Sequence, residues 1–188
     1  MPSEYFSTPL IFLIEILFGL YIGILALRII MQWANWEYSN PLVQFIIRVT
    51  QLPVKFLRKF IPPLGRWDSA TILLIVMLTV VKLLLIGFLQ SIPLNFVIVF
   101  RWMLADIFSL FITLFTASII IQVVLGWVTP HNGYNPITPL INRMNAPLLN
   151  PIKRLLPPMG GLDLSPLVAI IGLQILAMLV LPLLMAQY

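Results

Sequence analysis

The chain has 188 residues, of which 61% are hydrophobic and only 9% are charged, whereas about a quarter of a soluble domain is charged, so a soluble enzyme is excluded. It contains no cysteine and one histidine, which excludes disulfides, thiolate metal sites and metal sites built from several imidazoles. The net charge of +5 lies beside apolar segments, which favours a membrane surface as its partner and argues against nucleic acid.

Four apolar segments predict four transmembrane helices, since each has about 20 residues or more and is long enough to cross about 30 Å of hydrocarbon. They are expected at about 10–33, 70–90, 106–128 and 166–186. The first is too long for a signal-peptide core and no Lys or Arg precedes it, so we expect it to be retained. The sequence leaves open whether residues 92–103, which include Arg101, are interfacial or part of the third span. The predicted fold is an all-α membrane protein.

Basic residues are concentrated in the two loops that follow the first and third spans. Residues 34–69 contain five Lys or Arg and residues 129–165 contain three, whereas the connection between the second and third spans has only Arg101. The positive-inside rule therefore places both basic loops in the cytoplasm and both termini outside, in the periplasm of a bacterium.

The two halves of the chain are copies of one unit, residues 1–94 and residues 95–188. Each copy is a span, a basic loop and a second span, and both copies enter the membrane from the same side. Two parallel repeats of this kind imply a pseudo-two-fold axis along the membrane normal. At an offset of 95 positions, Arg48 aligns with Arg143, Arg58-Lys59 with Lys153-Arg154, and Asp68 with Asp163.

Each basic loop is expected to form two short amphipathic helices in the inner headgroup layer. From Pro41 to Ile61 polar residues recur at spacings of four and three, which is one face of a helix, and Asn40 is suited to cap its start. Pro53, and Pro147 and Pro151 in the second loop, predict a kink or a break. The cations would then face anionic lipid or a partner protein. These candidate binding residues are Arg48, Lys55, Arg58, Lys59, Arg143, Lys153 and Arg154.

A Pro-Pro-x-Gly-x-x-Asp turn closes both loops. Its prolines end the interfacial helix, its glycine permits a positive φ, and the acid or the serine after it is suited to cap the next span. We favour this geometric role for the prolines and glycines. A paired docking surface, formed by the two acids and the adjacent Arg and Lys pairs, is the alternative, and for those cations lipid anchoring and partner docking stay equally open. The turn residues are Pro62, Pro63, Gly65, Asp68, Pro157, Pro158, Gly160 and Asp163.

Three ionisable residues, Glu15, Lys82 and Asp106, lie inside or at the edge of the predicted spans. Charges at such depth are costly and are candidates for function. The depths of Glu15 and Lys82 are compatible with a direct ion pair, and Gly19 and Gly23 on the face of Glu15 would let another helix approach closely. These groups either hold the helices in register or line a path for ions or protons. We favour the first, because neither Glu15 nor Lys82 has a charged counterpart in the other repeat.

Two other polar residues are given no functional role. Arg28 lies near the inner end of the first span, where its long side chain is expected to reach the interface. His131 stands beside Pro130 and Asn132 and is expected to belong to a turn. The chain has no glycine-rich phosphate loop and no set of residues for a catalytic triad. We therefore expect no enzymatic activity and no cofactor.

Several segments together resemble the YggT family of small bacterial inner-membrane proteins, which has chloroplast relatives. The resembling segments are RIIMQW at 28–33, NPLVQFIIRVTQ at 40–51, LRKFIPPLG at 57–65 and NPIKRLLPPMGGLDLSP at 150–166. The resemblance implies a four-span inner-membrane protein that is not an enzyme. It also implies a link to osmotic-shock protection and ion homeostasis, to cell division or nucleoid organisation, or to cytochrome assembly as in chloroplasts.

Two hypotheses about function follow. In the first, the chain is an assembly or adaptor protein that supports the envelope under osmotic shock, with basic loops that bind anionic lipid and an unknown membrane or cytoplasmic protein. In the second, it is a small ion or proton pathway that uses Glu15, Lys82 and Asp106. Four spans leave little room for a water-lined path, so the second hypothesis requires a homo-oligomer.

Overall fold

The structure, a computed structural model, describes residues 2–62, 67–128, 135–156 and 163–185. Four of its helices are long and apolar enough to cross a membrane, within segments 7–33, 69–89, 96–128 and 165–185. The predicted all-α architecture with four spans is therefore confirmed. In chain order the helices are α1 (Pro2–Trp33), α2 (Pro41–Leu57), α3 (Ser69–Leu89), α4 (Phe96–Val128), α5 (Ile137–Leu155) and α6 (Ser165–Met185).

The third span begins earlier than predicted. α4 starts at Phe96, because the Asn95 side chain accepts a hydrogen bond from the backbone N–H of Ile98 at 2.8 Å and so caps the helix. Arg101 thus lies within α4 and donates to the backbone carbonyl of Leu183 at 2.6 Å. Since 33 residues of helix are about 50 Å long, α4 is longer than the hydrocarbon layer is thick.

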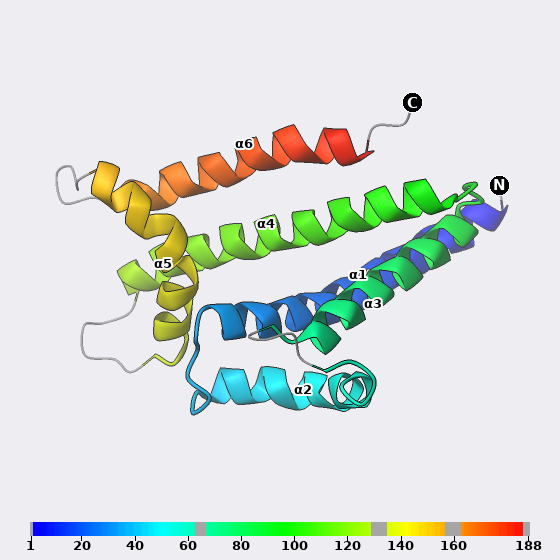
Figure 1. Cartoon of the computed structure of the whole chain (residues 1–188). Coiled ribbons are helices and arrows are strands. Elements are labelled where there is room, and N and C mark those ends of the chain that lie inside the picture. Colours follow the sequence, from blue (N-terminus) through cyan, green and yellow to red (C-terminus); the bar gives the residue numbers. More distant parts are fainter. Residues whose placement is uncertain (1, 63–66, 129–134, 157–162, 186–188) are drawn as a thin grey trace.

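The spans form two antiparallel pairs, α1 with α3 and α4 with α6, and α3 also packs on α4. Figure 1 shows α2 and α5 at one end of the spans. The start of α1, the end of α6 and the connection between α3 and α4 lie at the other end. Both basic loops therefore lie on the same side, as two parallel repeats require.

Within the described residues, each basic loop contains one helix, so the prediction that the loop helix is divided into two short helices is wrong. α2 continues through Pro53, and α5 continues through Pro147 and Pro151. A proline inside a helix costs about 3 kcal/mol or more. In α2 this cost is offset because Thr50 and Val54, on either side of Pro53, are both fully buried on one face. The predicted cap is confirmed: the Asn40 side chain accepts from the N–H of Leu42 at 2.9 Å.

Equivalent residues of the two repeats form equivalent cores, each joining two spans to an interfacial helix. In the first repeat, Leu25, Val54 and Leu74 belong to one buried cluster, and in the second repeat Ile119, Leu149 and Ala169 belong to another. These triplets are related by offsets of 94 or 95 positions. A third cluster contains Trp36, Val43 and Ile46 together with Leu140 and Met144 of α5. It joins the first interfacial helix to the second.

Candidate functional site

The seven cations predicted to bind lipid or a partner fall into two groups. Arg58, Arg143 and Lys153 are engaged in ion pairs within the chain. The other four are exposed, and their side chains have no ion pair or hydrogen bond with any residue that the structure describes. These unpaired cations are Arg48, Lys55, Lys59 and Arg154.

The first loop is held to the spans by a buried charge network centred on Asp68. Its carboxylate accepts hydrogen bonds from Arg58 at 2.5 and 3.2 Å and from the Thr71 hydroxyl at 2.8 Å. The Arg28 Nε atom lies 3.5 Å from the same carboxylate, and Arg28 also donates to the Thr50 hydroxyl at 2.6 Å. The side chains of Arg28 and Asp68 are only 4% and 2% exposed. The expectation that Arg28 reaches the interface is wrong, because α2 covers it.

The surroundings of Asp68 favour its charged form. Burial acts to raise the pKa of the carboxyl, but hydrogen bonds from Arg58 and Thr71, with the positive charges of Arg58 and Arg28, outweigh it and hold the pKa below its usual value. The same hydrogen bond from Arg58 to Asp68 raises the pKa of the Arg58 guanidinium. Asp68 is therefore ionised at neutral pH and supplies a counter-ion to two arginines.

The second loop has the equivalent ion pair in an exposed setting. Lys153 lies 2.9 Å from Asp163, and their side chains are 46% and 44% exposed. Asp163 also accepts from the backbone N–H of Ser165 at 2.9 Å, so its predicted capping role is confirmed. Burial acts to raise the pKa of Asp163, but hydrogen bonds from Lys153 and Ser165, with the positive charge of Lys153, together outweigh it and hold the pKa below its usual value. Asp68 does not cap α3 with its side chain, because its oxygens are used by the arginines.

A second polar contact is also repeated. In the second repeat the Asn145 amide donates to Gln122 at 2.7 Å and accepts from the Ser118 hydroxyl at 2.6 Å. Asn145 is fully buried. By the offsets of the repeat, Gln122 is equivalent to Arg28 and Asn145 to Thr50. Both interfacial helices are therefore tied to the preceding span by a polar pair at the same positions.

The two repeats are bridged at the loop ends. Arg143 donates to the backbone carbonyl of Asn35 at 2.8 Å and to Glu37 at 2.6 Å. The Asn40 side chain donates to the carbonyl of Pro136 at 2.7 Å. Arg143 was predicted to face lipid or a partner, but it binds the other repeat.

Most residues of the turn motif lie outside the part of the chain that the structure describes, which includes only three of its members. Pro63, Gly65, Pro157, Pro158 and Gly160 are not among them. Pro62 accepts a hydrogen bond through its carbonyl from the Ser69 hydroxyl at 2.7 Å. Asp68 is 3% exposed, so it does not contribute to a docking surface.

The intramembrane ion pair joins Lys82 to Asp106 at 2.5 Å, not to Glu15. Lys82 and Asp106 lie on helices joined by a short connection, so their outer halves are neighbours. Glu15 is exposed on α1 and has no polar partner among the described residues. A Cβ atom built on Gly19 or Gly23 would meet nothing within 4 Å, so the predicted close helix approach does not occur within the chain.

A small polar cavity adjoins this ion pair between α1, α3 and α4. It has a volume of about 170 Å³ and is lined by Lys82 and Asp106 and by the hydroxyl residues Thr79, Ser109 and Thr113. Thr79 is fully buried and its hydroxyl has no hydrogen-bond partner in the chain. A cavity of this size and polarity has room for water. Asp106 and Ser109 of α4 therefore face this cavity.

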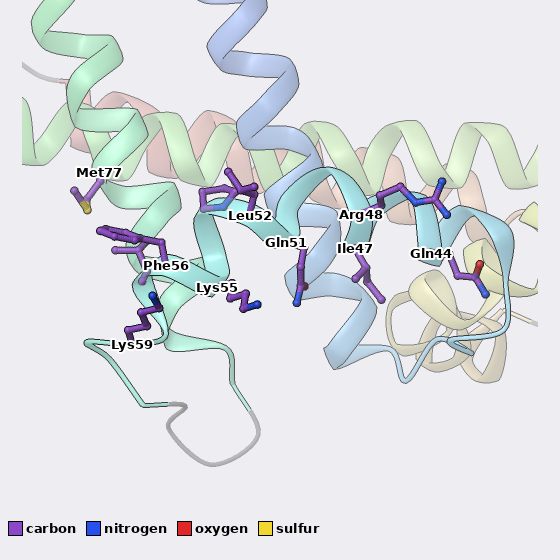
Figure 2. A pocket seen from close by; sticks show the side chains of 11 residues that line it. Gln44, Ile47, Arg48, Gln51, Leu52, Lys55, Phe56, Lys59 and Met77 are labelled. Carbon is purple, nitrogen blue, oxygen red and sulfur yellow. The ribbon is translucent and has the colours of Figure 1, made fainter.

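The unpaired cations of α2 border an open groove. Figure 2 shows this groove, with Gln44 at one end and Phe56 and Met77 at the other. Within the described ranges, no group of three or more His, Asp or Glu side chains is placed to hold a metal ion. The exposed cations along this groove suit binding of anions at a surface.

The family comparisons cover nearly the whole chain. A family model described as CCB3/YggT matches residues 7–89 and 101–184, one match per repeat. The uncharacterized protein PA0392 of Pseudomonas aeruginosa is 38% identical over 183 residues, 93% of this chain and 89% of that protein. A protein of Vibrio alginolyticus is 39% identical over 87% of this chain and 88% of its own length. YggT of Escherichia coli is 34% identical over 90% and 87%. No solved structure matches.

Proposed function

The chain belongs to the CCB3/YggT family, and from that premise we propose that it is a non-enzymatic assembly or adaptor protein of the bacterial inner membrane. Its interfacial helices α2 and α5 rest on the cytoplasmic leaflet, where they bind anionic lipid and hold a membrane or cytoplasmic partner protein. In this role the protein supports the envelope and ion homeostasis under osmotic shock.

The observation that carries the proposal is that the loop cations fall into two groups. Some form ion pairs within the chain, and the others are exposed and have no partner among the described residues. Arg28, Arg58 and Lys153 hold the loops to the spans through Asp68 and Asp163. Because those ion pairs fix the helices, the exposed cations without a partner in the described residues are not needed for the fold. Exposed basic residues beside an apolar helix face are the arrangement that binds an anionic membrane surface.

The orientation is supported by the positive-inside rule and is tested directly with single cysteines, since the chain has none of its own. Lys55→Cys and Lys153→Cys are expected to be protected from a membrane-impermeant maleimide added to intact cells. Both residues are exposed in the fold, so after permeabilisation both are labelled. Labelling of either residue in intact cells would contradict the proposed topology, in which both basic loops are cytoplasmic.

The proposed role is tested in a strain that lacks the gene, by survival after a salt upshift. A variant with Arg48→Gln, Lys55→Gln, Lys59→Gln and Arg154→Gln is expected to lose rescue while its membrane abundance is unchanged. Arg101→Gln, which removes a cation at the opposite end of the spans, is the control and is expected to rescue. Full rescue by the fourfold variant at equal abundance would contradict the proposal.

The polar cavity supports a second candidate function, an ion or proton pathway in an oligomer. Its lining places an ion pair next to three hydroxyl residues, including the unpartnered Thr79, and intramembrane ionisable groups commonly mark such pathways. Purified protein in vesicles is then expected to conduct protons or potassium, and Lys82→Met or Asp106→Asn to reduce the flux. Vesicles as tight as protein-free ones would exclude this function.

The two candidates predict opposite phenotypes in the same strain. The adaptor role is sensitive to the four free cations and insensitive to Lys82→Met. The pathway role is sensitive to Lys82→Met and insensitive to the free cations. Survival of each variant after the same salt upshift therefore distinguishes them.

A further inference from the structure

The interfacial helix α2 has three different faces along its length. One face is buried against the rest of the protein and a second carries polar and basic side chains. The third is apolar but exposed, and a surface helix in water normally has no such face. In the described structure the buried face consists of Val43, Ile46, Thr50 and Val54, and the exposed apolar face includes Leu42, Phe45, Val49, Leu52 and Phe56.

An open groove of about 1090 Å³ runs along α2 and reaches α3, a volume at the upper end of the range for sites that hold small molecules. Arg48, Lys55 and Lys59 line it, and no acidic residue is among its lining residues. All three cations are exposed and have no partner in the described part of the chain. The groove therefore offers three positive charges that are free to bind an anion.

Apart from Gln44 and Gln51, the remainder of the groove lining is apolar, and it extends toward the membrane interior. Leu52, Phe56 and Met77 are 84%, 61% and 48% exposed, and Figure 2 places Met77 beside Phe56 at one end of the groove. Met77 lies eight residues into α3 from Ser69, which is about 12 Å of helix. The groove thus joins a cationic region at the level of the interfacial helix to an apolar region within the hydrocarbon.

We infer that this groove binds one anionic phospholipid, with its headgroup in the positive field of the three cations and an acyl chain over the three apolar side chains. The inference rests on the proposed function and identifies the lipid that α2 holds. A soluble phosphate or an acidic protein segment would satisfy the cations but would not use an apolar surface that continues down a membrane span. Only a molecule with an anionic head and a long hydrocarbon chain matches both parts.

The second repeat does not have this site, so one lipid is expected per chain. Arg143, equivalent to Arg48, is bound to Glu37 and Asn35. The position of Lys55 is taken by Asn150 and that of Met77 by Gly172. Arg154, the equivalent of Lys59, is exposed and is the one cation at these positions that has no partner among the described residues.

The experiment uses the purified full chain in detergent, titrated with dioleoyl phosphatidylglycerol or dioleoyl phosphatidylcholine, with bound lipids counted by native mass spectrometry. We expect one tightly held phosphatidylglycerol and no equivalent phosphatidylcholine. Each cation near an anionic headgroup contributes roughly fivefold in affinity, so the variant R48Q/K55Q/K59Q is expected to bind about 100-fold more weakly. The charge-conserving variant R48K/K55R/K59R should keep most of the affinity, and Arg101→Gln, which removes a cation at the opposite end of the spans, should change nothing.

The apolar part has its own test. Leu52→Ala with Phe56→Ala should weaken binding of the lipid, and soluble glycerol 3-phosphate should compete poorly with the lipid for the unmodified protein. Equal retention of phosphatidylcholine, unchanged binding by R48Q/K55Q/K59Q, or efficient competition by glycerol 3-phosphate would each overturn the inference. These variants should unfold like the unmodified protein, because the altered side chains are exposed.

The failure of this site is distinguishable from failure of the proposed function. If R48Q/K55Q/K59Q keeps its lipid but loses rescue after a salt upshift, the cations serve a protein partner and the lipid site is wrong. If it loses its lipid but rescues fully, the lipid site is correct and the proposed role of these cations is wrong.

Discussion

The replacement Asp68→Asn tests whether the buried charge network holds the first loop to the spans. The change keeps the shape of the side chain but removes the negative charge between Arg28 and Arg58. Arg28 is 4% exposed, so it would keep a buried charge without a counter-ion. Breaking a buried pair in this way costs about 3–5 kcal/mol. The contribution of Arg58 is smaller, because its side chain is 41% exposed and solvent screens it.

The repeat provides a matched control in Asp163→Asn. This residue occupies the equivalent position, but its pair with Lys153 is nearly half exposed on both sides. An exposed pair contributes about 0–1 kcal/mol. The same chemical change should therefore be several times more costly at position 68 than at position 163, although each carboxylate closes the equivalent loop of its own repeat.

The free energy of unfolding is measured by titration with sodium dodecyl sulfate in mixed micelles, followed by the fluorescence of the five tryptophans. A second measurement places a single cysteine at Val54, which is fully buried on α2. A maleimide should label it slowly in the parent and faster when Asp68→Asn loosens α2. Equal losses of stability for the two Asn variants, with unchanged labelling at Val54→Cys, would show that the Asp68 network does not hold α2 to the spans.

Three further predictions use the same titration. The pKa of Asp68 lies below its usual value in the folded protein, so its contribution to the free energy of unfolding is full above about pH 3.9 and is lost as the pH falls further. The stability of Asp68→Asn should therefore fall less steeply with acid than that of the parent, and an equally steep fall would contradict this. Asn145→Leu leaves the Gln122 side chain without its partner, whereas the Ser118 hydroxyl can still donate to the carbonyl of Phe115. The change should cost about 1–3 kcal/mol; a neutral effect would contradict it. Arg143→Gln breaks an exposed bridge and should cost no more than about 1 kcal/mol; a larger loss would show that the bridge is essential to the fold.

The sequence predicts the spans, the repeat and the start of α2, because these depend on local features. Runs of apolar residues, the offset of 95 positions and Asn40 before Pro41 need no tertiary information. The single interfacial helices were missed, since whether a proline breaks a helix depends on what the two halves pack against. Pro53 is tolerated because the residues around it are buried on one face.

The polar contacts were harder to predict, because depth in the membrane does not fix the direction in which a side chain points. Glu15 and Lys82 have compatible depths, yet Lys82 contacts Asp106 on the next helix. Arg28 was expected at the interface, as a long cation near a helix end usually is, but α2 folds over it. A signal was present: Arg28 and Thr50 each align with a polar residue in the other repeat, Gln122 and Asn145.

Comparison of the repeats separates scaffold from function. The ion pair that links the interfacial helix to the next span is present in both copies, as Arg58–Asp68 in the first and Lys153–Asp163 in the second. If the free cations served only to orient the chain, a similar number would suffice in each loop. Instead the groove is built in one copy alone, and its apolar members Leu52 and Phe56 align with prolines in the other. A property that one repeat has and its copy lacks is not required by the shared fold, and this supports the proposed lipid site on α2.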